Sequence, residues 1–89
     1  MKKSTSAKSA RRYNTDRIDD AVLALMILGV HDQAGRTWKG FDWAALDRLH
    51  AKGHISDPRR KAKSVVFTPE GLERAQALFE TMFTTSDEA

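Results

Sequence analysis

The 89-residue sequence predicts a single small α+β domain with three principal helices and a two-stranded β-hairpin. Three observations lead to this class. A long apolar segment follows a basic start, a second helical segment is bounded by Asp42 and Gly53, and a short β-rich run precedes a helix that begins with proline. The composition, 40% apolar and 30% charged, is that of a globular chain, and the absence of Cys excludes disulfides and thiolate chemistry.

Residues 1–15 are expected to form a disordered basic tail that contains Arg11 and Arg12. Tyr13 is its only large side chain, and no apolar period is present. This composition fits both a solubilising tail and an arm that binds nucleic acid. A single domain is expected over residues 16–84, followed by a frayed C-terminus over residues 85–89.

The first helix is expected from Asp16, its N-cap, to Gly29, with Asp19 favouring the helix dipole. Beyond its first turn it is apolar on all sides, and a domain of this size surrounds such a helix poorly. A homodimer that covers part of it is therefore expected. The apolar run Ala21–Val30 is about half of the ~20 residues that span a bilayer, so no membrane partner and a cytoplasmic location are expected. One helical face is predicted to contain Ile18, Val22, Leu25, Met26 and Gly29, and the other sides Leu23, Ala24, Ile27 and Leu28.

A connector over His31–Gly40 leads to the second helix, for which Asp42 is the expected N-cap and Gly53 the residue after the C-terminus. The aromatic string from Trp38 to Trp43 is interpreted as a core anchor, with Lys39 over an indole ring. Trp43, Leu46 and Leu49 are predicted to face inward, and Ala44, Ala45, Arg48, Ala51 and Lys52 outward.

The hairpin is predicted from strand candidates at His54–Ser56 and Ser64–Thr68, joined by the polar loop Asp57–Lys63. Thr68 and Pro69 then start a third helix that ends near Phe83. The loop holds four cations, which fit contact with phosphates and equally fit a solvated edge that discourages strand pairing. These cations are Arg59, Arg60, Lys61 and Lys63.

No pattern predicts catalysis. His50 and His54 have the spacing of two zinc ligands on a helix, but Gly53 is expected to end the helix between them. Asp19 and Asp20 are adjacent on a helix and diverge by about 100°, so they do not converge on one substrate atom. We therefore expect that the protein is not an enzyme and that it needs no cofactor, metal or small-molecule ligand.

Two resemblances follow from these motifs. The chain from Asp42 to Phe83 resembles the second half of a winged helix-turn-helix domain, which implies a winged-helix-like fold with a recognition helix, a wing, a returning strand and a following helix. Asp16–Phe83 as a whole resembles a family of small uncharacterised bacterial proteins, which implies bacterial origin but no activity. The first rests on Leu46-x-x-Leu49-x-x-x-Gly53-x-Ile55, the basic wing Asp57–Lys63 and Val65-x-Phe67-Thr68-x-x-Gly71. The second rests on Ile18-Asp19-Asp20-Ala21-Val22-Leu23-Ala24-Leu25, Trp38-Lys39-Gly40-Phe41-Asp42-Trp43, Leu46-Asp47-Arg48-Leu49 and Lys61-Ala62-Lys63-Ser64-Val65-Val66.

The winged-helix resemblance implies nucleic-acid binding, with DNA as the partner. His31–Gly40 leaves room for at most one turn of the helix that normally precedes a recognition helix, and three alanines line the reading face. We therefore expect non-specific phosphate contacts; the alternative is a protein-interaction or dimerisation module without nucleic-acid binding. The candidate contacts are Arg59, Arg60, Lys61 and Lys63 in the wing, Arg48 and Lys52 on the helix, and Arg11 and Arg12 in the tail.

Overall fold

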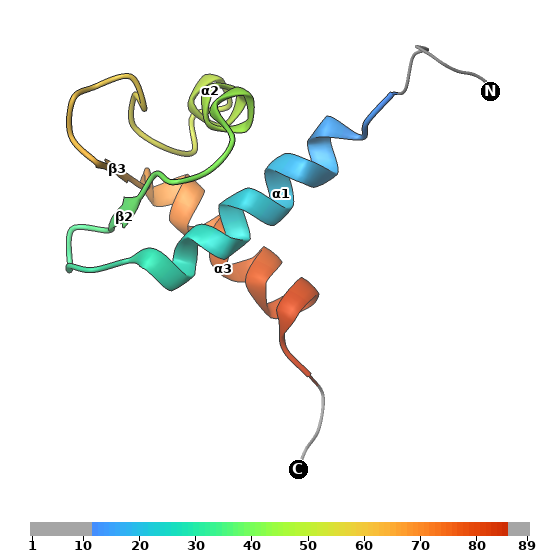
Figure 1. Cartoon of the computed structure of the whole chain (residues 1–89). Helices are drawn as coiled ribbons and strands as arrows, with labels where there is room; N and C mark the ends of the chain where they lie inside the picture. Colours follow the sequence, from blue (N-terminus) through green and yellow to red (C-terminus); the bar gives the residue numbers. More distant parts are fainter. Residues whose placement is uncertain (1–11, 86–89) are drawn as a thin grey trace.

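The computed structural model describes residues 12–85, so most of the predicted tail, Arg11 included, lies outside the described residues. Three helices and a two-stranded antiparallel sheet confirm the α+β class, in an arrangement compatible with a winged-helix-like fold. In Figure 1, α1 crosses α3, α2 lies to one side of both, and the sheet lies at one end of the crossing. The elements are α1 (Thr15–Leu25), a 3₁₀ turn η1 (Met26–Gly29), β2 (Arg36–Trp38), α2 (Trp43–Ala51), β3 (Ser64–Val66) and α3 (Pro69–Phe83).

Helix α1 differs from the predicted first helix at both ends. Its N-cap is Asn14 rather than Asp16, and the Asn14 side chain accepts a hydrogen bond from the backbone N–H of Arg17. The predicted helix also tightens into η1 at Met26. The helix is not enclosed on all sides: Leu23 and Ala24 are buried, but Leu28 in η1 is 70% exposed. Of the helical face predicted to contain Ile18, Val22, Leu25, Met26 and Gly29, only Met26 is fully buried.

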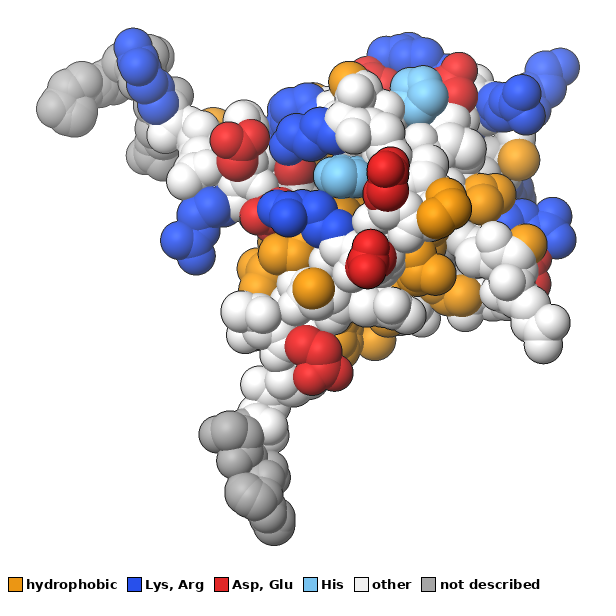
Figure 2. All heavy atoms as spheres, turned by 180° about the vertical axis from the view of Figure 1, so that it is seen from behind, with side chains coloured by type: hydrophobic (Ala, Val, Ile, Leu, Met, Phe, Trp, Pro, Cys, Tyr) orange, Lys and Arg blue, Asp and Glu red, His pale blue; other side chains and the backbone are white. Residues whose placement is uncertain are grey.

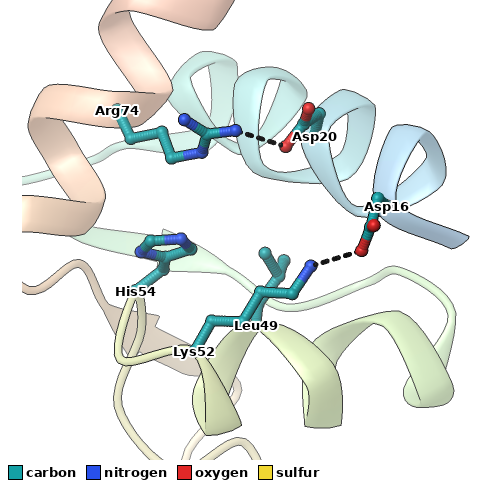
Figure 3. A pocket seen from close by; sticks show the side chains of 6 residues that line it. All are labelled: Asp16, Asp20, Leu49, Lys52, His54 and Arg74. Carbon is teal, nitrogen blue, oxygen red and sulfur yellow. Dashed lines mark hydrogen bonds and ion pairs between the residues drawn. The ribbon is translucent and has the colours of Figure 1, made fainter.

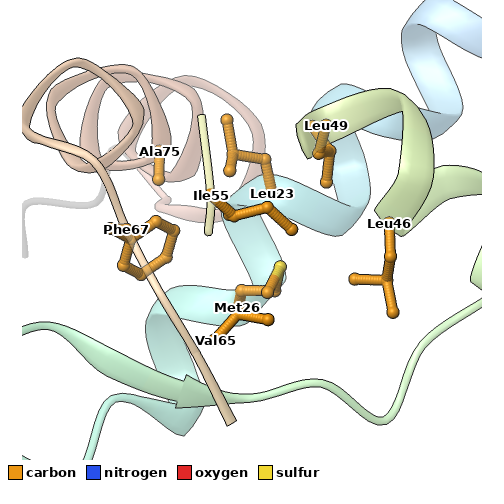
Figure 4. Packing of buried hydrophobic residues seen from close by; sticks show 8 residues of the cluster. All are labelled: Leu23, Met26, Leu46, Leu49, Ile55, Val65, Phe67 and Ala75. Carbon is orange, nitrogen blue, oxygen red and sulfur yellow. The ribbon is translucent and has the colours of Figure 1, made fainter. Parts of the chain in front are cut away.

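The core is a cluster of buried apolar side chains between α1, α2, α3 and the sheet (Figure 4). Helix α2 starts at the predicted N-cap Asp42, which accepts from the N–H of Ala45, and Gly53 follows it with a φ of +81°. Ala45 and Trp43 of α2 were assigned to the wrong faces, because Ala45 is buried and Trp43 is 53% exposed. The core cluster comprises Leu23, Met26, Leu46, Leu49, Ile55, Val65, Phe67 and Ala75.

The sheet pairs β3 with a strand that the sequence did not reveal. Strand β2, inside the predicted connector, pairs antiparallel with β3, with Thr37 opposite Val65. Thr37 is fully buried, and its hydroxyl donates to the carbonyl of Met26 in η1, which fixes β2 against the core. The predicted pairing of residues 54–56 with the segment of β3 is also present. It takes the form of an isolated antiparallel bridge between Ile55 and Phe67, beside which the N–H of Ser56 donates to the carbonyl of Val66 at 2.8 Å.

Helix α3 begins as predicted, with Thr68 as N-cap and Pro69 in the first turn. The Thr68 hydroxyl accepts from the N–H of Gly71 at 2.9 Å and donates to the carbonyl of Gly53 at 2.7 Å. The start of α3 is thus tied to the end of α2. The end of α3 projects beyond the core, since Phe83 is 43% exposed.

Candidate nucleic-acid interface

Residues 57–63, which we name the basic loop, are held in place by one lysine. The ammonium of Lys39 donates to the carbonyls of Pro58 and Arg60, both at 2.6 Å. The backbone N–H of Lys39 donates to the carbonyl of Lys63 at 3.2 Å, and Pro58 itself is buried. The loop backbone is therefore fixed near both ends by the segment that follows β2.

Two half-exposed tryptophans flank Lys39 in sequence. The Lys39 ammonium lies 5.6 Å from the centre of a Trp43 ring, which confirms the predicted cation–π contact. Trp38 stacks on His31 with ring centres 4.1 Å apart. Both indoles are 53% exposed, so the prediction that they anchor the core is wrong; Phe41 is the aromatic of this segment that packs against the core.

Three cations of the basic loop have no acidic partner among residues 12–85. Arg60, Lys61 and Lys63 are exposed and form no ion pair within the described chain, whereas Arg59 pairs with Asp47 of α2 at 2.7 Å. Figure 2 shows Lys and Arg side chains at the edge of the molecule away from its N-terminal end, where this loop lies, and others over the middle and the N-terminal side of the same face. The loop is therefore a local excess of positive charge. The other paired cations are Arg36, Arg48, Lys52 and Arg74.

Arg48 and Lys52 turn toward α1 rather than outward. Arg48 donates to both carboxylate oxygens of Asp19 at 2.8–3.0 Å, and the ammonium of Lys52 lies 3.0 Å from the same carboxylate. Asp19 is fully buried, and Lys52 also reaches Asp16 at 3.4 Å. Ala45, three residues before Arg48 on the same face of α2, is buried as well. We therefore assign Arg48 and Lys52 a structural role, which is to join α2 to α1.

The cations set the ionisation of Asp19. Burial alone raises its pKa, but the hydrogen bonds from Arg48 and Lys52 outweigh burial and hold the pKa below its usual 3.8. Asp19 therefore stays ionised inside the protein at neutral pH. This role of Asp19 was not predicted, because an acid in a first helical turn is explained by the helix dipole alone. The feature of the sequence that could have indicated a buried acidic partner is the i, i+4 spacing of Arg48 and Lys52 on one face of α2.

A polar cavity of about 410 Å³ lies beside this network, between α1, α2 and α3 (Figure 3). Arg74 of α3 pairs with Asp20 of α1 at 3.1 Å across it. His54 lies between the cations, and its Nδ1 is buried with no hydrogen-bond partner within the described part of the chain. Burial lowers the pKa of His54, and the positive charges of Arg74 and Lys52 lower it further. The lining residues are Asp16, Asp20, Leu49, Lys52, His54 and Arg74.

Comparison with known proteins places the chain in a family. A model for a domain of unknown function, DUF6429, matches residues 14–85. The chain belongs to the DUF6429 family. The uncharacterized protein y4hR of Sinorhizobium fredii is 56% identical over 69 residues, which are 78% of this chain and 92% of y4hR. The expected membership of a family of small uncharacterised bacterial proteins is thereby confirmed. No solved structure matches the chain.

Two further findings concern residues 12–85 of this DUF6429 domain. None of their helices is long and apolar enough to cross a membrane. Their His, Asp and Glu side chains also form no group of three that suits a metal ion. His50, half of the candidate zinc pair, instead has its Nδ1 3.0 Å from the carbonyl of Ile55.

The DUF6429 domain is expected to lose stability as the pH falls from 7.5 to 5.5 because of His54. The pKa of His54 in the folded chain lies below the usual 6.5. As the pH is lowered, His54 is therefore protonated in the unfolded chain before it is protonated in the folded chain, and the free energy of unfolding decreases. Urea unfolding of the wild type and of His54→Gln at both pH values measures this contribution. The variant is expected to lose less stability than the wild type; equal losses would show that His54 titrates normally in the folded domain.

Proposed function

We propose that this DUF6429 domain is a cytoplasmic protein, without enzymatic activity, that binds DNA through phosphate contacts made by the basic loop. The observation that carries the proposal is the group formed by Arg60, Lys61 and Lys63, which are exposed and unpaired within the described chain. Phosphate contacts supply most of non-specific DNA affinity. The loop backbone is already fixed by Lys39, so less conformational entropy is lost on binding.

The surface of α2 indicates that the proposed DNA contact does not read the base sequence. Arg48 and Lys52, the cations implied as readers, are engaged by the buried carboxylate of Asp19. The exposed positions Ala44 and Ala51 offer no hydrogen-bond donor to base edges. The interface we propose therefore positions the protein on the backbone and carries little sequence information. Arg12, which is exposed, and Arg11, outside the described residues, add charge from the N-terminal side.

The salt dependence of DNA binding tests this proposal. Three loop contacts predict a slope of log affinity against log salt of about −3 or steeper, since each neutralised phosphate contributes about −0.9. Replacing both Lys61 and Lys63 by alanine is expected to flatten the slope by about 2. The measurement is fluorescence anisotropy with a labelled random duplex between about 50 and about 200 mM salt.

A charge-matched control separates the basic loop from net charge. The double replacement of Arg36 and Arg74 by alanine removes two exposed cations that belong to β2 and α3. This variant is expected to keep the wild-type slope, apart from a small general loss of affinity. Loop and control variants with equal slopes would show that the loop is not the contact surface. A wild type that binds no duplex at about 50 mM salt would favour the alternative, a protein-interaction module.

A further inference from the structure

We propose that two copies of this chain associate through the C-terminal turns of α3. The apolar stripe of α3 continues past the last residue that the core covers: Ala75 is buried and Leu78 packs against the core cluster. Met82 and Phe83, one turn further, are 39% and 43% exposed. An apolar stripe that extends beyond its own core is typical of a helix with a partner.

A notch beside this stripe has room for an aromatic ring. It has a volume of about 290 Å³ and lies between α1 and α3, with Arg17 and Asp20 on one side and Leu78 and Met82 on the other. Figure 1 shows the two helices diverging from their crossing toward this end of the molecule. Phe83 follows Met82, about 100° further round the axis of α3, so an exposed aromatic side chain lies next to the notch without lining it.

Charge complementarity identifies the partner as a second copy. Arg17, at the notch, is exposed and forms no ion pair among the described residues. Glu80 is exposed, equally unpaired there, and three residues before Phe83, so both side chains lie on one face of α3. When Phe83 of a second copy enters the notch, its Glu80 approaches Arg17. Each copy carries the notch with Arg17 and also the side chains of Phe83 and Glu80. A two-fold axis between the copies therefore forms the same contact twice.

The mass of the full chain in solution tests the proposal without nucleic acid, so its outcome is separate from that of the DNA experiment. Sedimentation equilibrium at tens of micromolar is expected to give twice the 10.0 kDa of one chain. Phe83→Glu is expected to weaken association by at least about tenfold. Leu28→Glu, at an apolar residue that is 70% exposed on η1, is expected to leave association unchanged.

A charge swap tests the orientation of the two copies. Arg17→Glu alone and Glu80→Arg alone are each expected to weaken association, and the double variant to restore it. Circular dichroism checks that each variant keeps its helices. A 10.0 kDa species alone at every concentration would overturn the proposal. It would also be overturned if Leu28→Glu dissociated the protein and Phe83→Glu did not.

Discussion

A Gly71→Ala substitution is expected to destabilise the domain by at least about 3 kcal/mol, because α3 touches the backbone of residue 54 at this position. A Cβ at Gly71 would stand 1.9 Å from the carbonyl oxygen of His54. That carbonyl has no room to retreat, since it accepts the backbone N–H of Thr68 at 3.0 Å while the N–H of His54 donates to Leu49. Relief of the clash therefore requires separating α3 from the end of α2.

Gly40→Ala is the matched control for this prediction. A Cβ at Gly40 meets nothing within 4 Å. The expected change is within about 0.5 kcal/mol of the wild type. Urea denaturation monitored by circular dichroism measures both variants. A Gly71→Ala protein as stable as the wild type would mean that α3 does not approach His54 as closely as described.

Asp19→Ala is expected to lower the free energy of unfolding by about 3 kcal/mol. It removes the buried carboxylate that joins α1 to α2 and leaves Arg48 and Lys52 without the anion between them, with only the exposed Asp16 still 3.4 Å from Lys52. Loss of a partner from a buried ion pair costs about 3–5 kcal/mol. The lower end applies because the side chains of Arg48 and Lys52 are 33% and 36% exposed and regain water.

Asp47→Ala provides the comparison for Asp19→Ala, since it removes an acid from an exposed ion pair with Arg59. A pair of that kind contributes about 1 kcal/mol or less. The pKa of Asp19 is lowered in the folded chain, so its stabilisation is complete above pH 3.8 and disappears as the pH falls through the folded pKa. Asp19→Ala should therefore lose this acid-dependent step. Equal costs for the two variants would contradict the structural role of Asp19.

The elements that were predicted correctly depend on local chemistry. Asp42 caps α2, Gly53 ends it with a positive φ, and Thr68 with Pro69 starts α3, each through contacts within a few residues. The pairing of β2 with β3 depends on residues far apart in the sequence. Thr37 and Val65 are separated in the sequence by the whole of α2, and three residues carry too little alternation to indicate a strand.

The face of α2 was misassigned for a related reason. Ala45, Arg48 and Lys52 lie on one face of α2, and a face that carries two cations is normally expected to be in water. The acid that draws them inward, Asp19, lies 29 residues before Arg48. The cations of the basic loop were recognised from local composition alone, whereas the role of Lys39 in fixing the loop required the structure.

The most direct test of the basic loop as a DNA-contacting surface is an NMR titration of isotope-labelled protein with a random duplex at low salt. We expect amide shifts concentrated at Arg60–Lys63, with smaller shifts at Lys39 and at the indole of Trp43, which lies next to its ammonium. Residues at the end of α3, such as Phe83, should stay unperturbed. Shifts confined to that end, or no shifts at all, would contradict DNA binding through the basic loop.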